Sequence, residues 1–123
     1  RELDQHDGLV KILCGVVINR KLRETSRADA MHAIIYLVFH EKNVMAMARI
    51  SGLLEMLTEV ALYKDEDDQI QKWAGAALWK LTCCPENKII VASRTACLRV
   101  ILHYFKSADH VLVGYAVAIL KQL

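Results

Sequence analysis

The sequence nearly repeats itself at a spacing of slightly more than forty residues. The stretch 73–81 aligns with 115–123 at an offset of 42 residues and with 29–37 at an offset of 44. In each stretch an alanine is followed by an aliphatic residue four positions on and by a leucine three positions later. These aligned positions are Ala30, Ile34 and Leu37, then Ala74, Leu78 and Leu81, then Ala116, Leu120 and Leu123. A fixed period of this length is typical of stacked helical repeats, in which no unit can bury its apolar face alone.

The composition agrees with one helical domain. The chain has 123 residues, of which 54% are hydrophobic and 24% are charged, so it can form a real core. A single proline and five glycines permit long helices. No β-type alternation is sustained, and the apolar segment 33–39 is far shorter than the roughly 18 residues of a membrane span. We therefore expect an all-α protein without a membrane-spanning helix.

Charge and cysteine usage narrow the possible environment and partners. The net charge of +2 is too small to indicate nucleic-acid binding, which favours a clustered basic stripe. The four cysteines show no disulfide framework, and the neighbours Cys83 and Cys84 are poorly placed for an ordinary disulfide. Free thiols indicate a reducing compartment, so we expect a cytoplasmic protein, with the nucleus as the other possibility. The chain begins with Arg1, without Met or a signal peptide, and we expect it to be a piece of a longer protein.

Apolar periodicity and breaking residues predict seven or eight helices. Thr25 or Ser26 is expected to cap the second helix, Ser51 the fourth, and the segment 107–109 the last. Pro85 should end the helix before it. The predicted helices lie at about 9–22, 26–40, 44–48, 52–62, 69–81, 89–92, 96–105 and 111–123.

This order of short and long helices resembles the armadillo repeat. In that family a unit has a short helix, a longer one, and a third that packs antiparallel to the second. The segments 87–91, 96–102 and 111–123 resemble one complete unit, and Gly52-Leu53-Leu54 matches the family's Gly-apolar-Leu site. The resemblance implies a right-handed α-solenoid of about three units, at 8–39, 43–82 and 87–123. The HEAT repeat, with two helices per unit, is the alternative.

The resemblance also implies where a partner would bind, because armadillo third helices line a concave groove. Residues four apart on a helix share one face. Trp79 precedes a groove position and is the aromatic residue to test first. The expected groove residues are His32 and Tyr36, then Lys72, Ala76 and Lys80, then Ala118 and Gln122.

The expected groove differs from the family's best-known peptide site. Nuclear-import adaptors carry a ladder of Trp and Asn on their third helices, whereas this chain has Ala76 and Lys80 at those positions. A basic nuclear-localisation peptide is therefore not expected as the ligand. The side chains of Lys72, Lys80 and His32 favour a ligand with acidic or polar character.

No catalytic or metal site is expected. His103 and His110 are seven residues apart, with no further ligand at zinc spacing. Cys14 and Cys97 fall on apolar helix faces and are predicted to be core residues, not nucleophiles. Gly75 and Gly114 are interpreted as close-packing positions inside helices, and there is no glycine-rich phosphate loop. We thus expect a non-enzyme that needs no cofactor.

The sequence predicts a protein-interaction or scaffold module that binds a partner peptide or helix on its concave face. Self-association through the end faces of the stack is an alternative, since the last unit would expose an apolar edge. A regulatory domain of a larger enzyme is another. Nucleic-acid binding is the least favoured reading and would require strongly salt-dependent affinity.

Overall fold

The computed structural model describes residues 2–123, with side chains from Asp7 onward. The described residues form helices joined by short loops and contain no strand, so the all-α prediction is confirmed. In chain order the helices are α1 (Glu2–Ile18), α2 (Glu24–Val38), α3 (Val44–Met47), α4 (Leu53–Leu62), α5 (Asp68–Thr82), α6 (Pro85–Ala92), α7 (Thr95–Phe105) and α8 (His110–Gln122).

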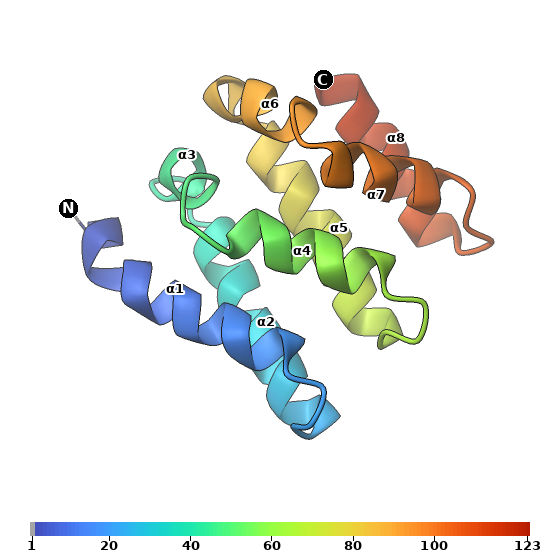
Figure 1. Ribbon diagram of the computed structural model, residues 1–123. Helices are drawn as coiled ribbons and strands as arrows, with labels where there is room; N and C mark the ends of the chain where they lie inside the picture. Colours follow the sequence, from blue (N-terminus) through green and yellow to red (C-terminus); the bar gives the residue numbers. More distant parts are fainter. Residues whose placement is uncertain (1) are drawn as a thin grey trace.

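The long helices form two layers. Figure 1 shows α1, α4 and α7 side by side in one layer, with α2, α5 and α8 behind them. Each helix of the first layer packs on the next long helix of the sequence, giving the pairs α1–α2, α4–α5 and α7–α8. Within the layers, α4 lies between α1 and α7, and α5 lies between α2 and α8. The short helices α3 and α6 both pack against α5.

Two helices begin with the same aspartate cap at an offset of 42 residues. The Asp67 carboxylate accepts a hydrogen bond from the Ile70 amide at 3.0 Å, at the start of α5. The Asp109 carboxylate accepts one from the Val111 amide at 2.9 Å, at the start of α8. The expected cap in the segment 107–109 is therefore confirmed, and the carboxylates also suit the positive helix ends.

Two other predicted caps and one predicted helix start are wrong. Helix α2 begins at Glu24 without a side-chain cap, and Thr25 and Ser26 lie inside it. Helix α4 is preceded by Gly52, not capped by Ser51, because the chain turns there with a φ of 95° that glycine adopts without strain. Pro85 begins α6 four residues before the predicted start, since a first-turn position needs no amide hydrogen.

Two buried asparagines, 44 residues apart, fix the short helices. The Asn43 side-chain amide donates to the Leu37 carbonyl at 3.2 Å. The Asn87 amide donates to the Leu81 carbonyl at 2.9 Å and to the Val44 carbonyl at 3.0 Å. In both cases the asparagine side chain donates to the carbonyl six residues earlier, at the C-terminal end of the preceding long helix.

The two glycines that were predicted to be close-packing positions, Gly75 and Gly114, behave differently. A Cβ atom on Gly75 would lie 2.9 Å from ring atoms of both Tyr104 and Tyr115, so the predicted close packing is confirmed there. Gly114 is exposed and a Cβ atom would meet nothing within 4 Å, so the same prediction is wrong for it. The difference arises because α5 lies between two helices of its layer, whereas α8 has a neighbour on one side only.

A buried ion pair joins the first two helix pairs. Arg27, at the start of α2, donates to both carboxylate oxygens of Glu66, at 2.7 Å and 3.0 Å. Glu66 lies in the loop between α4 and α5, and its side chain is 1% exposed. The Arg27 Nε also donates to the Val17 carbonyl at 2.6 Å, which ties the end of α1 into the same cluster.

Within residues 2–123, none of the helices is both long and apolar enough to cross a bilayer.

Candidate protein-binding face

The predicted groove residues lie on α2, α5 and α8, the second layer of the fold. We call this surface the second-layer face. His32 and Tyr36 are exposed, and 74% of Tyr36 is accessible. Lys72, Trp79, Lys80, Ala118 and Gln122 are half-buried.

Ala76 is a correction to the predicted groove, because only 8% of it is exposed. The helical spacing places it on the same side of α5 as Lys72 and Lys80. Helices α2 and α8 both pack against α5, however, and together they cover its middle. Ala76 is therefore part of the floor between these helices and offers almost no surface to a partner.

An aromatic contact joins α2 and α5. The His32 ring stacks on the Trp73 ring with 5.3 Å between the ring centroids and 12° between the planes. Trp73 therefore packs against the neighbouring helix pair. His32 is consequently held in place by the second helix pair and remains exposed at its other side.

A second aromatic group lies where α2 ends. The Phe39 and Trp79 rings have centroids 6.3 Å apart and are tilted by 42°. Lys80 forms an ion pair with Glu41, and its Nζ lies 5.9 Å from the Phe39 ring centroid, within reach of a weak cation–π attraction. The segment 39–41 thus folds over the C-terminal part of α5.

The lysine nearer the start of α5 also has carboxylate partners. The Lys72 Nζ lies 2.9 Å from Asp68 and 3.7 Å from Asp109 at the start of α8. The hydrogen bond with Asp68 raises the pKa of Lys72, so the ammonium form is favoured. Both lysines of the predicted groove therefore pair with carboxylates of the same chain, which an acidic ligand would have to displace.

A shallow cavity opens beside Tyr36. Its volume is about 320 Å³ and it is lined by His32, Ile35, Tyr36, Phe39 and His40. We call it the α2 aromatic cavity. Phe39 is 39% exposed, so two aromatic rings of this cavity are accessible to a partner.

The sequence analysis missed Phe39 and Glu41 as members of this face. Both follow the end of α2, in a segment where helical periodicity gives no information about direction. An aromatic residue directly after a helix was the available signal for Phe39. For Glu41 no local signal exists, because its partner Lys80 is 39 residues away.

Two of the thiols, those of Cys14 and Cys97, lie inside the helical core. Burial raises the pKa of the Cys14 and Cys97 thiols to about 11, and the Glu55 carboxylate contributes at both positions, so little reactive thiolate forms near neutral pH. Both residues are buried, which confirms their prediction as core residues. Among the side chains from Asp7 onward, no group of three His, Cys, Asp or Glu is arranged to hold a metal ion.

No protein-family model matches this chain, and comparison with curated proteins and with solved structures finds no significant match.

Proposed function

We propose that the chain is a protein-interaction module that binds a partner peptide or helix on its second-layer face, and that its helices form a right-handed armadillo-like solenoid of three units. Helix pairs stacked in two layers, with short helices α3 and α6 between them, support the repeat assignment. The equivalent bonds of Asn43 and Asn87, and of Asp67 and Asp109, support the same unit boundaries. The free thiols fit a cytoplasmic location.

The α2 aromatic cavity is the observation that carries the binding proposal. Tyr36 and Phe39 expose large aromatic rings at a concave place on a helical scaffold. Exposed aromatic residues beside a pocket are typical of interface hot spots, since they bury much area and lose little side-chain entropy. The partner's anchor would be an apolar side chain seated between these rings.

The rigid scaffold favours binding of an extended peptide or a helix. His32 is held by its stacking on Trp73, and the segment 39–41 is held by Trp79 and Lys80. The partner then bears most of the ordering entropy, while the module reorganises little.

A displayed peptide library, selected on the immobilised protein, tests the proposal. We expect selected peptides to share an apolar anchor and to lose at least tenfold in affinity for Tyr36→Ala and for Phe39→Ala. A matched control is Ile89→Ala, which removes an exposed apolar side chain from α6, away from the cavity. Isothermal titration gives the affinities, and circular dichroism verifies that all variants keep their helices.

Peptides that bind Tyr36→Ala as tightly as the wild type would place the binding site elsewhere. Failure to select any peptide above background would remove the proposed function for this face. Lys80→Glu distinguishes the role of charge: it should alter the polar flanks of selected peptides and retain the apolar anchor.

A further inference from the structure

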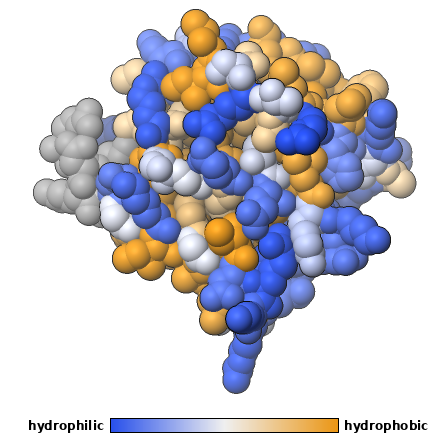
Figure 2. Space-filling model, in the orientation of Figure 1, coloured by the Kyte–Doolittle hydropathy of each residue, from blue (hydrophilic) through white to orange (hydrophobic). Residues whose placement is uncertain are grey.

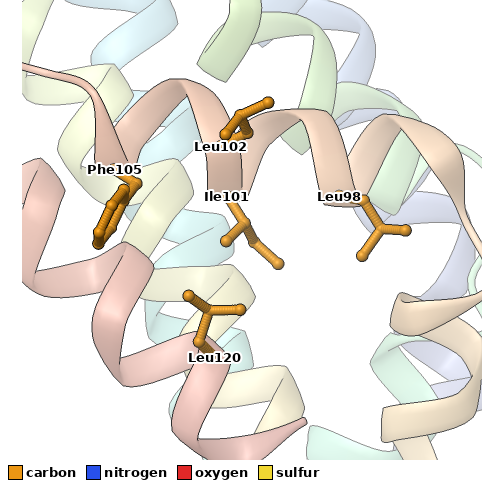
Figure 3. A pocket seen from close by; sticks show the side chains of 5 residues that line it. All are labelled: Leu98, Ile101, Leu102, Phe105 and Leu120. Atoms are coloured by element: carbon orange, nitrogen blue, oxygen red, sulfur yellow. The ribbon is translucent and has the colours of Figure 1, made fainter.

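The segment 20–27, which runs from the loop between α1 and α2 into the first turn of α2, is rich in positive charge. Four of its eight residues are basic, namely Arg20, Lys21, Arg23 and Arg27. Figure 2 shows hydrophilic side chains gathered at the lower end of the molecule, where Figure 1 places this loop. The groove between α7 and α8 has the opposite character, since apolar side chains alone line it (Figure 3). We call residues 20–27 the basic segment.

Ser26 lies in the basic segment, and its spacing from the arginines is particular to it. Arg23 stands three residues before Ser26, and Arg20 stands six residues before it. None of the other seven serines and threonines of the chain has a lysine or arginine three residues before it. Protein kinases select substrates partly by charge pattern, and arginine-directed kinases read a basic residue at this spacing. The spacing therefore singles out Ser26 as a phosphate acceptor.

The fold leaves the Ser26 side chain accessible. Ser26 and Arg23 are both exposed, and the loop that precedes α2 is not helical. Other hydroxyl groups of the chain are less available. Thr58 and Thr82 are buried, and their hydroxyls donate to backbone carbonyls at 3.0 Å and 2.7 Å. Ser26 thus combines the arginine spacing with an exposed position.

The start of α2 also differs from the starts of the equivalent helices α5 and α8. Those two are capped by Asp67 and Asp109, whose carboxylates accept hydrogen bonds from first-turn amides. The repeat offsets of 44 and 42 residues place Arg23 at the same position before α2, where no side chain caps the helix. A helix start carries partial positive charge, so an anion is favourable there and an arginine is not. Helix α2 therefore lacks the capping carboxylate that its equivalents have.

We propose that an arginine-directed serine/threonine kinase phosphorylates Ser26, and that the phosphate supplies the anion that the start of α2 lacks. In this step the Ser26 Oγ attacks the γ-phosphorus of ATP, the bond from that phosphorus to the β–γ bridging oxygen breaks, and ADP leaves. The hydroxyl proton passes to the catalytic aspartate of the kinase. The product carries a charge of about −1.5 to −2 at neutral pH, in the first turn of α2.

Little structure has to open for a kinase to reach Ser26. The loop before α2 is already irregular, so only the turn 24–26 has to unwind. Helix ends open more easily than helix interiors, and this end has no side-chain cap. Opening stops at Arg27, because its guanidinium is held by the buried ion pair with Glu66 and by the Val17 carbonyl. The packing of α2 is therefore kept during the modification.

The phosphate should stabilise the fold once it is in place. It is attracted by the first-turn amides of α2 and by Arg23, whereas the exposed Glu24 and Asp29 repel it through water. The attraction dominates because the amides are fixed in place, and we expect the melting temperature to rise by about 2–4 °C. The modification is independent of the proposed peptide binding, since ten residues, or about 15 Å of helix, separate Ser26 from Tyr36.

Treatment of the folded protein with an arginine-directed kinase, ATP and Mg²⁺ tests the proposal. Mass spectrometry of proteolytic fragments locates the phosphate, which we expect on Ser26 and no longer find there in Ser26→Ala. Arg23→Gln should lower the rate of phosphate incorporation at least tenfold. The matched control is Lys21→Gln, which removes the same charge from an exposed position nearby and should lower the rate less than threefold. Circular dichroism verifies that the variants keep their helices.

A synthetic peptide of residues 18–28 separates recognition of the sequence from accessibility in the fold. We expect both the peptide and the folded protein to be phosphorylated. Phosphate on the peptide alone would overturn the proposal, because the fold would then hide the hydroxyl. Absence of phosphate from both would overturn it too, as would modification of Ser51 in place of Ser26, since Ser51 is also exposed and has Arg49 two residues before it. A melting temperature that phosphorylation leaves unchanged or lowers would refute the stabilising role.

Discussion

Breaking the buried ion pair of Arg27 and Glu66 should be the most damaging single polar change in the described structure. Arg27 is 6% exposed and directs two hydrogen bonds to the Glu66 carboxylate and one to the Val17 carbonyl. The same carboxylate accepts hydrogen bonds from Arg20 at 3.1 Å and from the Asp67 amide at 2.9 Å. The pair thereby joins α1, α2 and the loop between α4 and α5.

The magnitude follows from what each substitution leaves behind. Glu66→Leu leaves the Arg27 guanidinium buried without its counter-charge, and Arg27→Met leaves the carboxylate with Arg20 as its one cationic partner among the described contacts and with the Asp67 amide. Removing one partner of a buried pair costs about 3–5 kcal/mol in unfolding free energy. A domain of this size has about 5–15 kcal/mol in total, so each single variant would approach the limit of stability. The double variant removes both charges and should recover most of the loss.

Urea unfolding, followed by circular dichroism, measures the unfolding free energies of the wild type, the two single variants and the double variant, which together form a double-mutant cycle. We expect a coupling energy of at least about 2 kcal/mol between Arg27 and Glu66. As a control, Arg94→Met removes an exposed ion pair. The Arg94 guanidinium nitrogen lies 2.6 Å from a Glu55 carboxylate oxygen, and the two side chains are 42% and 59% exposed. Its cost should stay within about 1 kcal/mol. Single losses below that value, or losses that simply add in the double variant, would refute the reasoning.

Three further predictions concern close packing and a buried hydrogen-bond donor. Gly75→Ala should destabilise the fold by about 1–3 kcal/mol, because its Cβ would lie 2.9 Å from two tyrosine rings. Gly114→Ala should stabilise α8 by up to about 1 kcal/mol, so in thermal unfolding the first variant should have a lower melting temperature than the wild type and the second a higher one. Leu54→Ala should lower the unfolding free energy by about 2–4 kcal/mol and Leu98→Ala by less than about 1 kcal/mol, because these leucines, equivalent at an offset of 44 residues, are 1% and 47% exposed. Equal losses in urea unfolding would contradict this difference in burial. Asn87→Ala should cost about 1–3 kcal/mol because the Leu81 and Val44 carbonyls lose a buried donor, and hydrogen exchange should show faster opening of α6.

The positions of the long helices could be predicted because helical periodicity is a local property of the sequence. Apolar residues at spacings of three and four placed α4, α5, α7 and α8 close to their observed ranges, whereas the first helix was expected at 9–22 and lies at Glu2–Ile18. Helix starts were less predictable, since several backbone conformations can begin a helix. Gly52 begins α4 through a positive φ, and Arg23 precedes α2 with no side-chain cap at all. Thr25 and Ser26 were reasonable caps by residue type, but the chain enters the helix before reaching them.

The candidate face was predictable in its register and unpredictable in its contacts. Counting by four residues placed His32 and Tyr36 on one side of α2, where the structure has them. The stacking of His32 on Trp73 depends on the separation and angle of two helices, which no local pattern contains. The burial of Ala76 has the same origin, because the closeness of α2 and α8 to α5 decides how much of α5 stays open.

These contacts change which forces can supply affinity on the second-layer face. An acidic ligand that pairs with Lys80 must replace Glu41, and exchanging one exposed carboxylate for another leaves the Coulomb energy nearly unchanged. Covering the Tyr36 ring has no such opposing loss, and full burial of a large apolar side chain contributes about 1.5–3 kcal/mol. The same repeat position carries Tyr36, Lys80 and Gln122 in successive helix pairs. Binding energy on this face should therefore concentrate on the first pair, where that position is aromatic, with the charged residues of the second pair setting ligand orientation.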